Sequence, residues 1–210
     1  MSTFTKVLLN PQRRGARKLL LNPQAMHAAV RSTFPPDIDE SETRVLWRVD
    51  HRGHEHTLYI VGPEKPDASG LIEQAGWDTR PAQSADYQPF LDKLMRGQQW
   101  RFELVANPVK SKAVKDSKRG RITPLVGQGQ VDWLLKRSQA AGFSLIDAST
   151  TGQENLRFRR GEGKNQVSLR TARFTGVLEV EDAEQLRSTL THGIGRARAY
   201  GCGLLTLARP

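Results

Sequence analysis

The sequence predicts an α+β protein made of two successive βαββαβ units. Each half of the 210-residue chain contains, in order, an apolar strand pattern, a helix pattern, two strand patterns, a second helix pattern and a final strand. The first strand of each half ends in Asn-Pro and a basic segment, as KVLLNP and again as ELVANP. Two such units form a tandem ferredoxin-like, RRM-like fold, and we expect domains at residues 1–90 and 91–210.

The elements of the first half follow from local signals. An apolar and β-branched run predicts a strand at 4–10, and the following basic segment is expected to be a loop. Asn22 as N-cap and Pro23 at the first helical position predict a helix that ends near Phe34. The remaining expected elements are hairpin strands at 43–52 and 56–62 around Gly53, a helix at 68–76 capped by Ser69, and an extended stretch near 77–83.

The second half repeats this order and adds a hairpin arm. A strand at 99–108 and a basic loop precede a helix at 129–143, whose expected buried face carries Val131, Leu134, Leu135 and Ala141. The remaining expected elements are strands at 144–149, 154–160 and 167–181, a helix from the cap Asp182 to Gly193, and a last strand at 202–208. The extra arm spans residues 154–171 and is basic.

The distribution of charge points to a polyanionic partner. The formal net charge is +10, yet residues 37–92 hold 12 acids and 5 bases while the remainder holds 10 acids and 27 bases. No acid precedes Asp37. Clustered bases set apart from an acidic region are typical of nucleic-acid binding, and a generally basic solvated surface is the alternative. Because the strands carry few aromatic residues, we expect RNA contacts through charge and shape rather than base stacking on a sheet.

The candidate RNA-binding residues fall in four segments of the chain, namely the basic segment after the first strand, the basic loop of the second half, the hairpin arm and the C-terminal glycine-rich stretch. They are Arg13, Arg14, Arg17 and Lys18, then Lys110, Lys112, Lys115, Lys118 and Arg119, then Arg157, Arg159, Arg160 and Lys164, and finally Gly195, Arg196 and Arg198. In the last group, glycines would let the backbone approach RNA closely and arginines would supply the charge.

Composition excludes several other classes of protein. No apolar run has the length of a membrane span, and the short apolar stretch at the N-terminus is unlike a secretory signal. The single cysteine, Cys202, excludes an internal disulfide and a multi-cysteine zinc site, and its apolar surroundings favour a buried small side chain. These features predict a cytoplasmic protein without a membrane contact.

The helix that begins at Asn22 carries the strongest candidate for acid–base chemistry. Its apolar stripe leaves His27 one position outside the core face, with Arg31 one turn further along. A nearby cation disfavours the charged imidazolium and holds the histidine pKa in a range suited to proton transfer. RNA cleavage by its own 2′-hydroxyl needs such a proton-transfer group and cations that stabilise the phosphorane. The alternative is a half-buried helical histidine without a chemical role.

Residue types for a metal site are sparse. His51, His54 and His56 lie in DHRGHEH, where a polar hairpin turn is favoured over a metal site. His192 precedes the glycine-rich stretch and suits a helix C-terminus. The sequence shows no paired-carboxylate cluster of the two-metal kind, so we expect neither a metal nor another cofactor.

At this level of detail the chain resembles the CasE family, the CRISPR repeat-processing endoribonucleases of the type I-E Cascade complex. The resemblance is carried, over nearly the whole chain, by FTKVLLNPQRRGARK, NPQAMHAAVRSTFP, RFELVANPVKSK and FTGVLEVEDAEQLRSTLTHGIGRARAYGCGLLTLA. It implies a tandem ferredoxin-like fold and metal-independent cutting at the base of the repeat stem-loop. It also implies that the product crRNA stays bound within Cascade, beside the other Cascade subunits.

The resemblance assigns roles to particular residues. The family's catalytic histidine matches His27, whereas the tyrosine that some members place three positions earlier is replaced here by Gln24, which cannot act as a phenolic acid. Arg31 or a loop arginine would then carry more of the electrostatic stabilisation. Two other functions stay open from the residues alone. One is an RNA-hairpin-binding subunit that does not cleave, and the other is a metal nuclease using the DHRGHEH turn.

Overall fold

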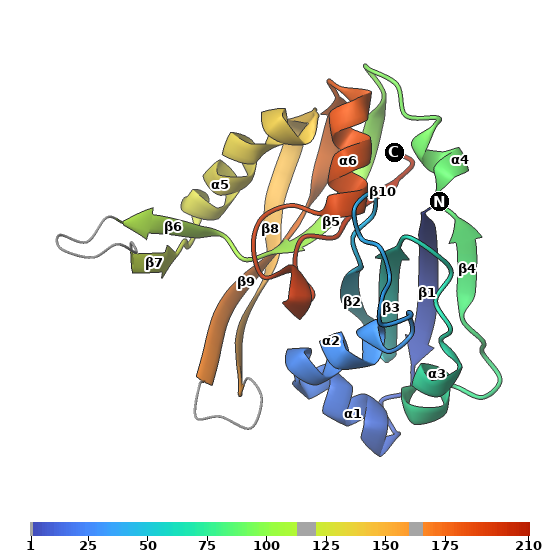
Figure 1. Cartoon of the computed structure of the whole chain (residues 1–210). Coiled ribbons are helices and arrows are strands. Elements are labelled where there is room, and N and C mark those ends of the chain that lie inside the picture. The colour runs from blue at the N-terminus through green and yellow to red at the C-terminus, as the bar shows by residue number, and fades with distance from the viewer. Residues whose placement is uncertain (1, 113–120, 160–165) are drawn as a thin grey trace.

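The computed structural model describes residues 2–112, 121–159 and 166–210, and the side chains of Lys112 and Arg121 are outside that description. The described chain forms two four-stranded antiparallel sheets, each with helices on one face (Figure 1). Sheet one has the strand order β2-β3-β1-β4, and sheet two has the order β10-β5-β9-β8. When the four strands of each sheet are numbered 1 to 4 in chain order, sheet one has the order 2-3-1-4 and sheet two the order 4-1-3-2. These are the same ferredoxin-like arrangement, written from opposite edges. The predicted tandem ferredoxin-like fold is confirmed.

Sheet one follows the alternation of its sequence. In β1 (Thr3–Leu9), every second side chain from Thr3 to Leu9 is buried. Its other strands are β2 (Leu46–Arg52), β3 (Glu55–Gly62) and β4 (Gln83–Asp86). The helices of this unit are α1 (Arg14–Leu21), α2 (Pro23–Arg31), α3 (Ser69–Ala75) and the short α4 (Gln88–Leu91). Val7 and Leu58 share a buried cluster with Met26 of α2 and Leu71 of α3.

Sheet two carries the larger buried cluster. Its strands are β5 (Gln99–Ala106), β8 (Phe143–Arg159), β9 (Gln166–Val180) and β10 (Leu205–Ala208). The helices on its face are α5 (Gln128–Ser138), extended by the 3-10 turn η1 (Gln139–Ala141), and α6 (Ala183–His192). A further 3-10 turn, η2 (Arg198–Tyr200), precedes β10. Phe174 of β9 and Leu190 of α6 are fully buried in this cluster. Cys202 is buried as expected, and this burial raises the pKa of its thiol to about 12.

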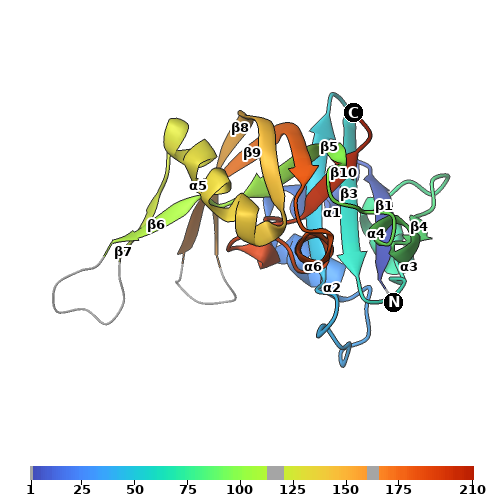
Figure 2. The ribbon, with the colours of Figure 1, turned by 90° about the horizontal axis from the view of Figure 1, so that it is seen from above.

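Two hairpins extend away from the sheets on the same side of the molecule (Figures 1 and 2). One is the predicted arm, formed by the far halves of β8 and β9, which pair as far as Arg159 and Gln166. The other is the separate two-stranded sheet of β6 (Val109–Lys112) and β7 (Arg121–Pro124). That second hairpin lies in the segment predicted as a basic loop, so the prediction is wrong there.

Several predicted boundaries also differ. The segment after Pro11 was expected to be a loop and forms helix α1 instead. The expected strands at 144–149 and 154–160 are one long strand, β8, with register shifts near Asp147 and Gly152. The stretch expected near 77–83 is replaced by β4, which begins at Gln83. Ser69 is the first helical residue of α3 rather than its cap. The N–H and the hydroxyl of Ser69 both donate hydrogen bonds to the Asp67 side chain.

The buried face of α5 is rotated relative to the prediction. Leu134 and Ala141 are buried as expected, whereas Leu135 is 57% exposed and Trp133 takes its place in the core. The stack of Trp133 on Phe174, with ring centroids 6.2 Å apart, fixes this rotation. Among the residues that the structure describes, no helix is both long enough and apolar enough to cross a membrane.

Candidate active site and RNA interface

Helix α2 places His27 at the edge of a buried face. The helix begins as predicted, because the Asn22 side chain accepts hydrogen bonds from the backbone N–H groups of Gln24 at 3.0 Å and Ala25 at 3.3 Å. Met26 and Val30 are fully buried and fix the rotation of the helix. His27 is half-buried beside them, and its Nδ1 is buried with no hydrogen-bond partner among the described residues.

The surroundings of His27 favour its neutral form. Burial lowers the pKa of the imidazole below its usual value, and the charge of Arg31 lowers it further, while Glu40 acts in the opposite direction. Arg31 itself donates a hydrogen bond from Nη1 to Glu40 Oε1 at 2.6 Å, and the other oxygen of that carboxylate accepts the N–H of Val45. Arg31 thus lowers the histidine pKa as predicted, although the Arg31 guanidinium is itself paired with the Glu40 carboxylate.

The glycine-rich loop, residues 193–204, packs against α2 through η2. It begins at Gly193, which caps α6 as predicted with φ of +77° and donates its N–H to Thr189 O. Within the loop Arg196 is exposed, whereas Arg198 is half-buried and donates from Nη2 to Gly193 O at 2.9 Å. Burial, with the nearby charge of Arg44, lowers the pKa of Arg198.

Packing inside the protein explains the loop's glycines. A Cβ built on Gly195 would lie 2.9 Å from the Trp133 ring, and one on Gly201 would lie 2.7 Å from the Trp47 ring. A Cβ on Gly203 would lie 2.8 Å from the carbonyl oxygen of Ile194. These positions also have φ between +77° and +93°. Glycine is thus required at all three positions by the fold, and a role of Gly195 in RNA contact stays a prediction.

The basic segment after the first strand presents its charges on helix α1. Arg14, Arg17 and Lys18 are exposed at helical spacing along one side, while Ala16 and Leu19 are buried. Arg13 differs from its neighbours. Its guanidinium contacts Asp78 at 2.6 Å and donates to the carbonyl oxygens at the end of α3, so it joins α1 to α3.

The arm brings two of the predicted basic segments next to each other. Leu19 and Leu20 of α1 line the same cavity, of about 100 Å³, as Glu154 and Leu156 of the arm. Further out, a second hollow of about 390 Å³ is lined by Arg157 and Arg170 of the arm together with Thr123 and Pro124 of β7. The arm thus adjoins α1 on one side and β7 on the other, so three segments that carry predicted RNA contacts are neighbours in the fold.

The exposed candidates for phosphate contact lie on these elements. On the hairpins these are Lys110 of β6 and Arg157 and Arg159 of the arm. Lys112 belongs to β6 but its side chain lies outside the described part of the chain. Five further candidates, Lys115, Lys118, Arg119, Arg160 and Lys164, fall wholly outside the described residues.

The other histidines form a polar turn, as favoured from the sequence. His51 and His56 are cross-strand partners in the β2–β3 hairpin, and their Nδ1 atoms lie 2.6 Å apart in a hydrogen bond. His192 lies at the end of α6 and contacts the carbonyl oxygens of Ser188 and Ser41. Over the described ranges 2–112, 121–159 and 166–210, no group of three or more His, Cys, Asp or Glu side chains is placed to hold a metal ion.

Two residues near the site were not identified from the sequence. Trp47 of β2 and Tyr200 of η2 line the cavity beside α2. The Tyr200 ring packs against Phe158 of the arm in a tilted arrangement, with ring centroids 4.7 Å apart. Their place depends on the docking of the glycine-rich loop on β2, a contact between residues 147 or more positions apart. The cluster of glycines at 193, 195, 201 and 203 is the sequence signal for such close packing, but it does not indicate which rings the glycines meet.

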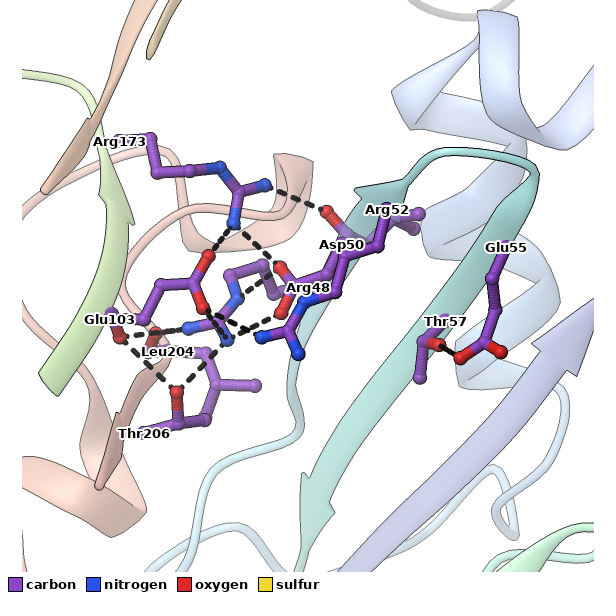
Figure 3. Close-up of polar contacts among 10 residues, drawn as sticks. Arg48, Asp50, Arg52, Glu55, Thr57, Glu103, Arg173, Leu204 and Thr206 are labelled. Atoms are coloured by element: carbon purple, nitrogen blue, oxygen red, sulfur yellow. Dashed lines mark hydrogen bonds and ion pairs between the residues drawn. The ribbon is translucent and has the colours of Figure 1, made fainter. Parts of the chain in front are cut away.

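A second feature that the sequence does not predict is a buried ion-pair network between the two sheets (Figure 3). Arg48 of β2 is 2% exposed and contacts both oxygens of Asp50, at 2.7 and 2.8 Å. Arg173 of β9 contacts Asp50 at 2.8 Å and also pairs with Glu103 of β5. Burial alone would raise the Asp50 pKa, but the hydrogen bonds and charges of the two arginines lower it.

Comparison with known proteins agrees with this geometry. A family model described as CRISPR associated protein matches residues 4–209. The CRISPR-associated endoribonuclease Cse3 of Thermus thermophilus is 34% identical, with 98% of this chain and 99% of that protein aligned. A structure of Thermus thermophilus Cse3 bound to an RNA representing a pre-cleavage complex matches with a TM-score of 0.83 and 31% identity, over 99% of this chain and 98% of that one. A crystal structure of Cas6e from Escherichia coli has the same fold, with a TM-score of 0.70 and 23% identity over both whole chains. This chain belongs to the family of CRISPR-associated proteins that includes the endoribonuclease Cse3.

Proposed function

We propose that this chain is the crRNA-processing endoribonuclease of a type I-E Cascade complex. It cleaves CRISPR precursor RNA at the base of the repeat stem-loop and keeps the product crRNA bound. The relative Cse3, aligned over 98% of this chain, is named as an endoribonuclease, and the Escherichia coli relative CasE is named as a Cascade subunit. The half-buried His27 lies on α2, the helix that the basic, glycine-rich loop packs against, and this arrangement supports the same activity.

The proposed reaction is a metal-independent transesterification. The 2′-hydroxyl of the nucleotide before the cut loses its proton to a general base, its oxygen bonds to phosphorus, and the bond to the 5′-oxygen breaks. The 5′-oxygen takes up a proton, which leaves a 2′,3′-cyclic phosphate and a 5′-hydroxyl. His27 is the proton-transfer group, and the cations of Arg31 and the glycine-rich loop stabilise the phosphorane charge.

The location of His27 is the observation that carries this proposal. The ring is only partly buried, its pKa is lowered, and it belongs to a helix that touches the loop of Arg196 and Arg198. A neutral imidazole beside cations is the form that a general base requires. Gln24 lies on the same helix but lacks an ionisable hydroxyl, so the second proton-transfer group comes from elsewhere.

The direct test is incubation of the purified protein with a labelled repeat RNA, with and without EDTA. We expect equal cleavage in both reactions and no cleavage of an RNA with a single 2′-deoxy substitution at the cut. Shifted but intact RNA would favour the non-cleaving binding subunit. Cleavage that EDTA stops, together with its loss in His54→Ala, would favour the metal nuclease of the DHRGHEH turn.

The dependence of cleavage on pH follows from the neighbours of His27. A general base acts in its neutral form, so the acidic limb of the single-turnover rate reports the histidine pKa. Arg31→Met removes the cation that lowers the His27 pKa and leaves Glu40, which raises it. We therefore expect the acidic limb to move to higher pH in this variant. In Glu40→Gln the opposing charge is lost, and we expect the limb to move to lower pH. A shift of both variants in one direction would contradict the assignment.

RNA binding should depend on salt through the α1 cations. Each phosphate contact contributes about 0.7 to 0.9 to the slope of log affinity against log salt. Replacing Arg14, Arg17 and Lys18 together by glutamine should therefore reduce the magnitude of the slope by about 2. A matched variant replaces Arg52, Lys65 and Arg80, which are also exposed but lie in the acidic segment. An equal loss in both variants would exclude a specific contact at α1.

We further propose a cytoplasmic location, with the other Cascade subunits and the crRNA as partners. The acidic segment 37–92 holds none of the predicted RNA contacts. The division of the chain into domains at residues 1–90 and 91–210 is part of this proposal.

A further inference from the structure

Strand β2 contacts the glycine-rich loop through three consecutive residues. A Cβ built on Gly193 would lie 3.1 Å from the side chain of Leu46, and one on Gly201 would lie 2.7 Å from the ring of Trp47. The third residue, Arg48, donates a hydrogen bond from Nη1 to Leu204 O at 3.1 Å. The start, the middle and the end of the loop are thus each held by one residue of β2.

These contacts come from both faces of the strand. Successive side chains of a strand point to opposite faces, and β2 is an edge strand of sheet one. Leu46 belongs to the buried cluster of sheet two, whereas Trp47 belongs to the cluster of α1 and α2. The glycine-rich loop is therefore held around the edge of sheet one and contacts both clusters.

Arg48 holds the end of the glycine-rich loop in a fixed position. Its five N–H groups all have acceptors, which are the two oxygens of Asp50, the carbonyl oxygens of Glu103 and Leu204, and Thr206 Oγ1 at 2.9 Å (Figure 3). A planar guanidinium with every donor used has a single orientation. The carbonyl of Leu204, where the loop joins β10, is thereby fixed to sheet one.

Trp47 connects the loop to the helix of His27. Its side chain is 5% exposed and lies in the same buried cluster as Met26 and Val30 of α2. The ring that faces Gly201 is thus part of the packing that supports α2, while η2 lies against that helix. A shift of this ring would change the distance between the loop and the helix that carries His27.

We propose that Trp47 is a positioning residue for RNA cleavage, which sets the glycine-rich loop against α2 while Arg48 fixes the end of the loop. This inference rests on the proposed function, because the loop and His27 must meet the same phosphate. Trp47 acts through Gly201 and the α2 core and makes no contact with the reacting atoms. A displacement of about 1 Å in such a site can cost about 10²-fold in rate.

A double-mutant cycle on Trp47 and Gly201 tests the inference. Gly201→Ala places a methyl group against the tryptophan ring, and Trp47→Leu removes that ring. The strain of alanine at a φ of +77° is the same in both backgrounds and cancels in the cycle. The readouts are the single-turnover cleavage rate at saturating protein, the Kd for a 2′-deoxy RNA that cannot be cleaved, and the Tm.

We expect Gly201→Ala to reduce the saturating rate by about 10²-fold with little change in Kd. In the Trp47→Leu background the same substitution should cost much less, since the collision is gone. Trp47→Phe, which keeps an aromatic ring, should retain most of the rate. The control Gly97→Ala has a similar φ of +83° and open space around it, so it should leave the rate unchanged.

Additive effects of the two substitutions on the cleavage rate would overturn the inference. A variant in which the rate falls, the RNA binds more weakly and the Tm falls together would also overturn it, because that pattern indicates a purely structural role. If Gly201→Ala does not fold, the variants Trp47→Phe and Trp47→Leu decide alone. For each of them, the change in the saturating cleavage rate is compared with the change in the Kd for 2′-deoxy RNA. An unmodified protein that fails to cut repeat RNA would instead refute the proposed function. The two failures are therefore distinguishable.

Discussion

His27→Ala is expected to reduce the saturating rate of RNA cleavage by about 10²- to 10⁴-fold, the usual contribution of a general acid or base. Binding of the repeat hairpin should persist, because the cations of α1 and the arm are unchanged. The measurement is single-turnover cleavage in EDTA, combined with a Kd for 2′-deoxy RNA.

A matched histidine variant separates this effect from a general loss. His54→Ala changes an exposed residue in the β2–β3 turn and should cleave like the unmodified protein. Added imidazole should restore part of the activity of His27→Ala if the missing group transfers a proton. Unchanged cleavage in His27→Ala would remove the histidine from the mechanism.

Arg48→Met is expected to lower the free energy of unfolding by about 3–5 kcal/mol, the cost of removing one partner from a buried ion pair. The substitution leaves Asp50 with Arg173 alone and deprives the carbonyls of Glu103 and Leu204 of a donor. Equilibrium unfolding in urea measures the loss, and the slope of the transition shows whether unfolding remains two-state.

Arg52 provides the control on the same strand. It is 73% exposed and lies 3.5 Å from Glu103, so Arg52→Met should change the free energy of unfolding by less than about 1 kcal/mol. Equal stability of Arg48→Met and Arg52→Met would mean that solvent or a rearranged Arg173 compensates the buried carboxylate. The network would then contribute little to holding the two sheets together.

Local signals were sufficient for most of the fold. Alternation, caps and Asn-Pro boundaries located both β1 and α2, and the repeat of this order predicted the two ferredoxin-like sheets. Helix α1 was missed because it has no acid in its first turn, no side-chain cap and a glycine at its second position. That glycine serves packing, since a Cβ on Gly15 would lie 2.2 Å from the carbonyl oxygen of Gln74 on α3. Such a requirement depends on a distant segment.

The candidate site was likewise predictable only where local signals determine it. The helical period placed His27 beside the core and Arg31 within reach of it, and both positions are as expected. The use of Arg13 and Arg31 in ion pairs with Asp78 and Glu40 was not predictable, because their acidic partners lie on other elements. Charge clustering finds basic segments, but it does not show which cations the fold has already neutralised.

The proposed site combines a helix from the start of the chain with a loop that lies beyond residue 192. A nascent polypeptide on the ribosome carries the histidine early, yet it has no loop to set against that helix until nearly all of sheet two has been synthesised. The proposed site is therefore complete only after translation has passed the glycine-rich loop that follows α6.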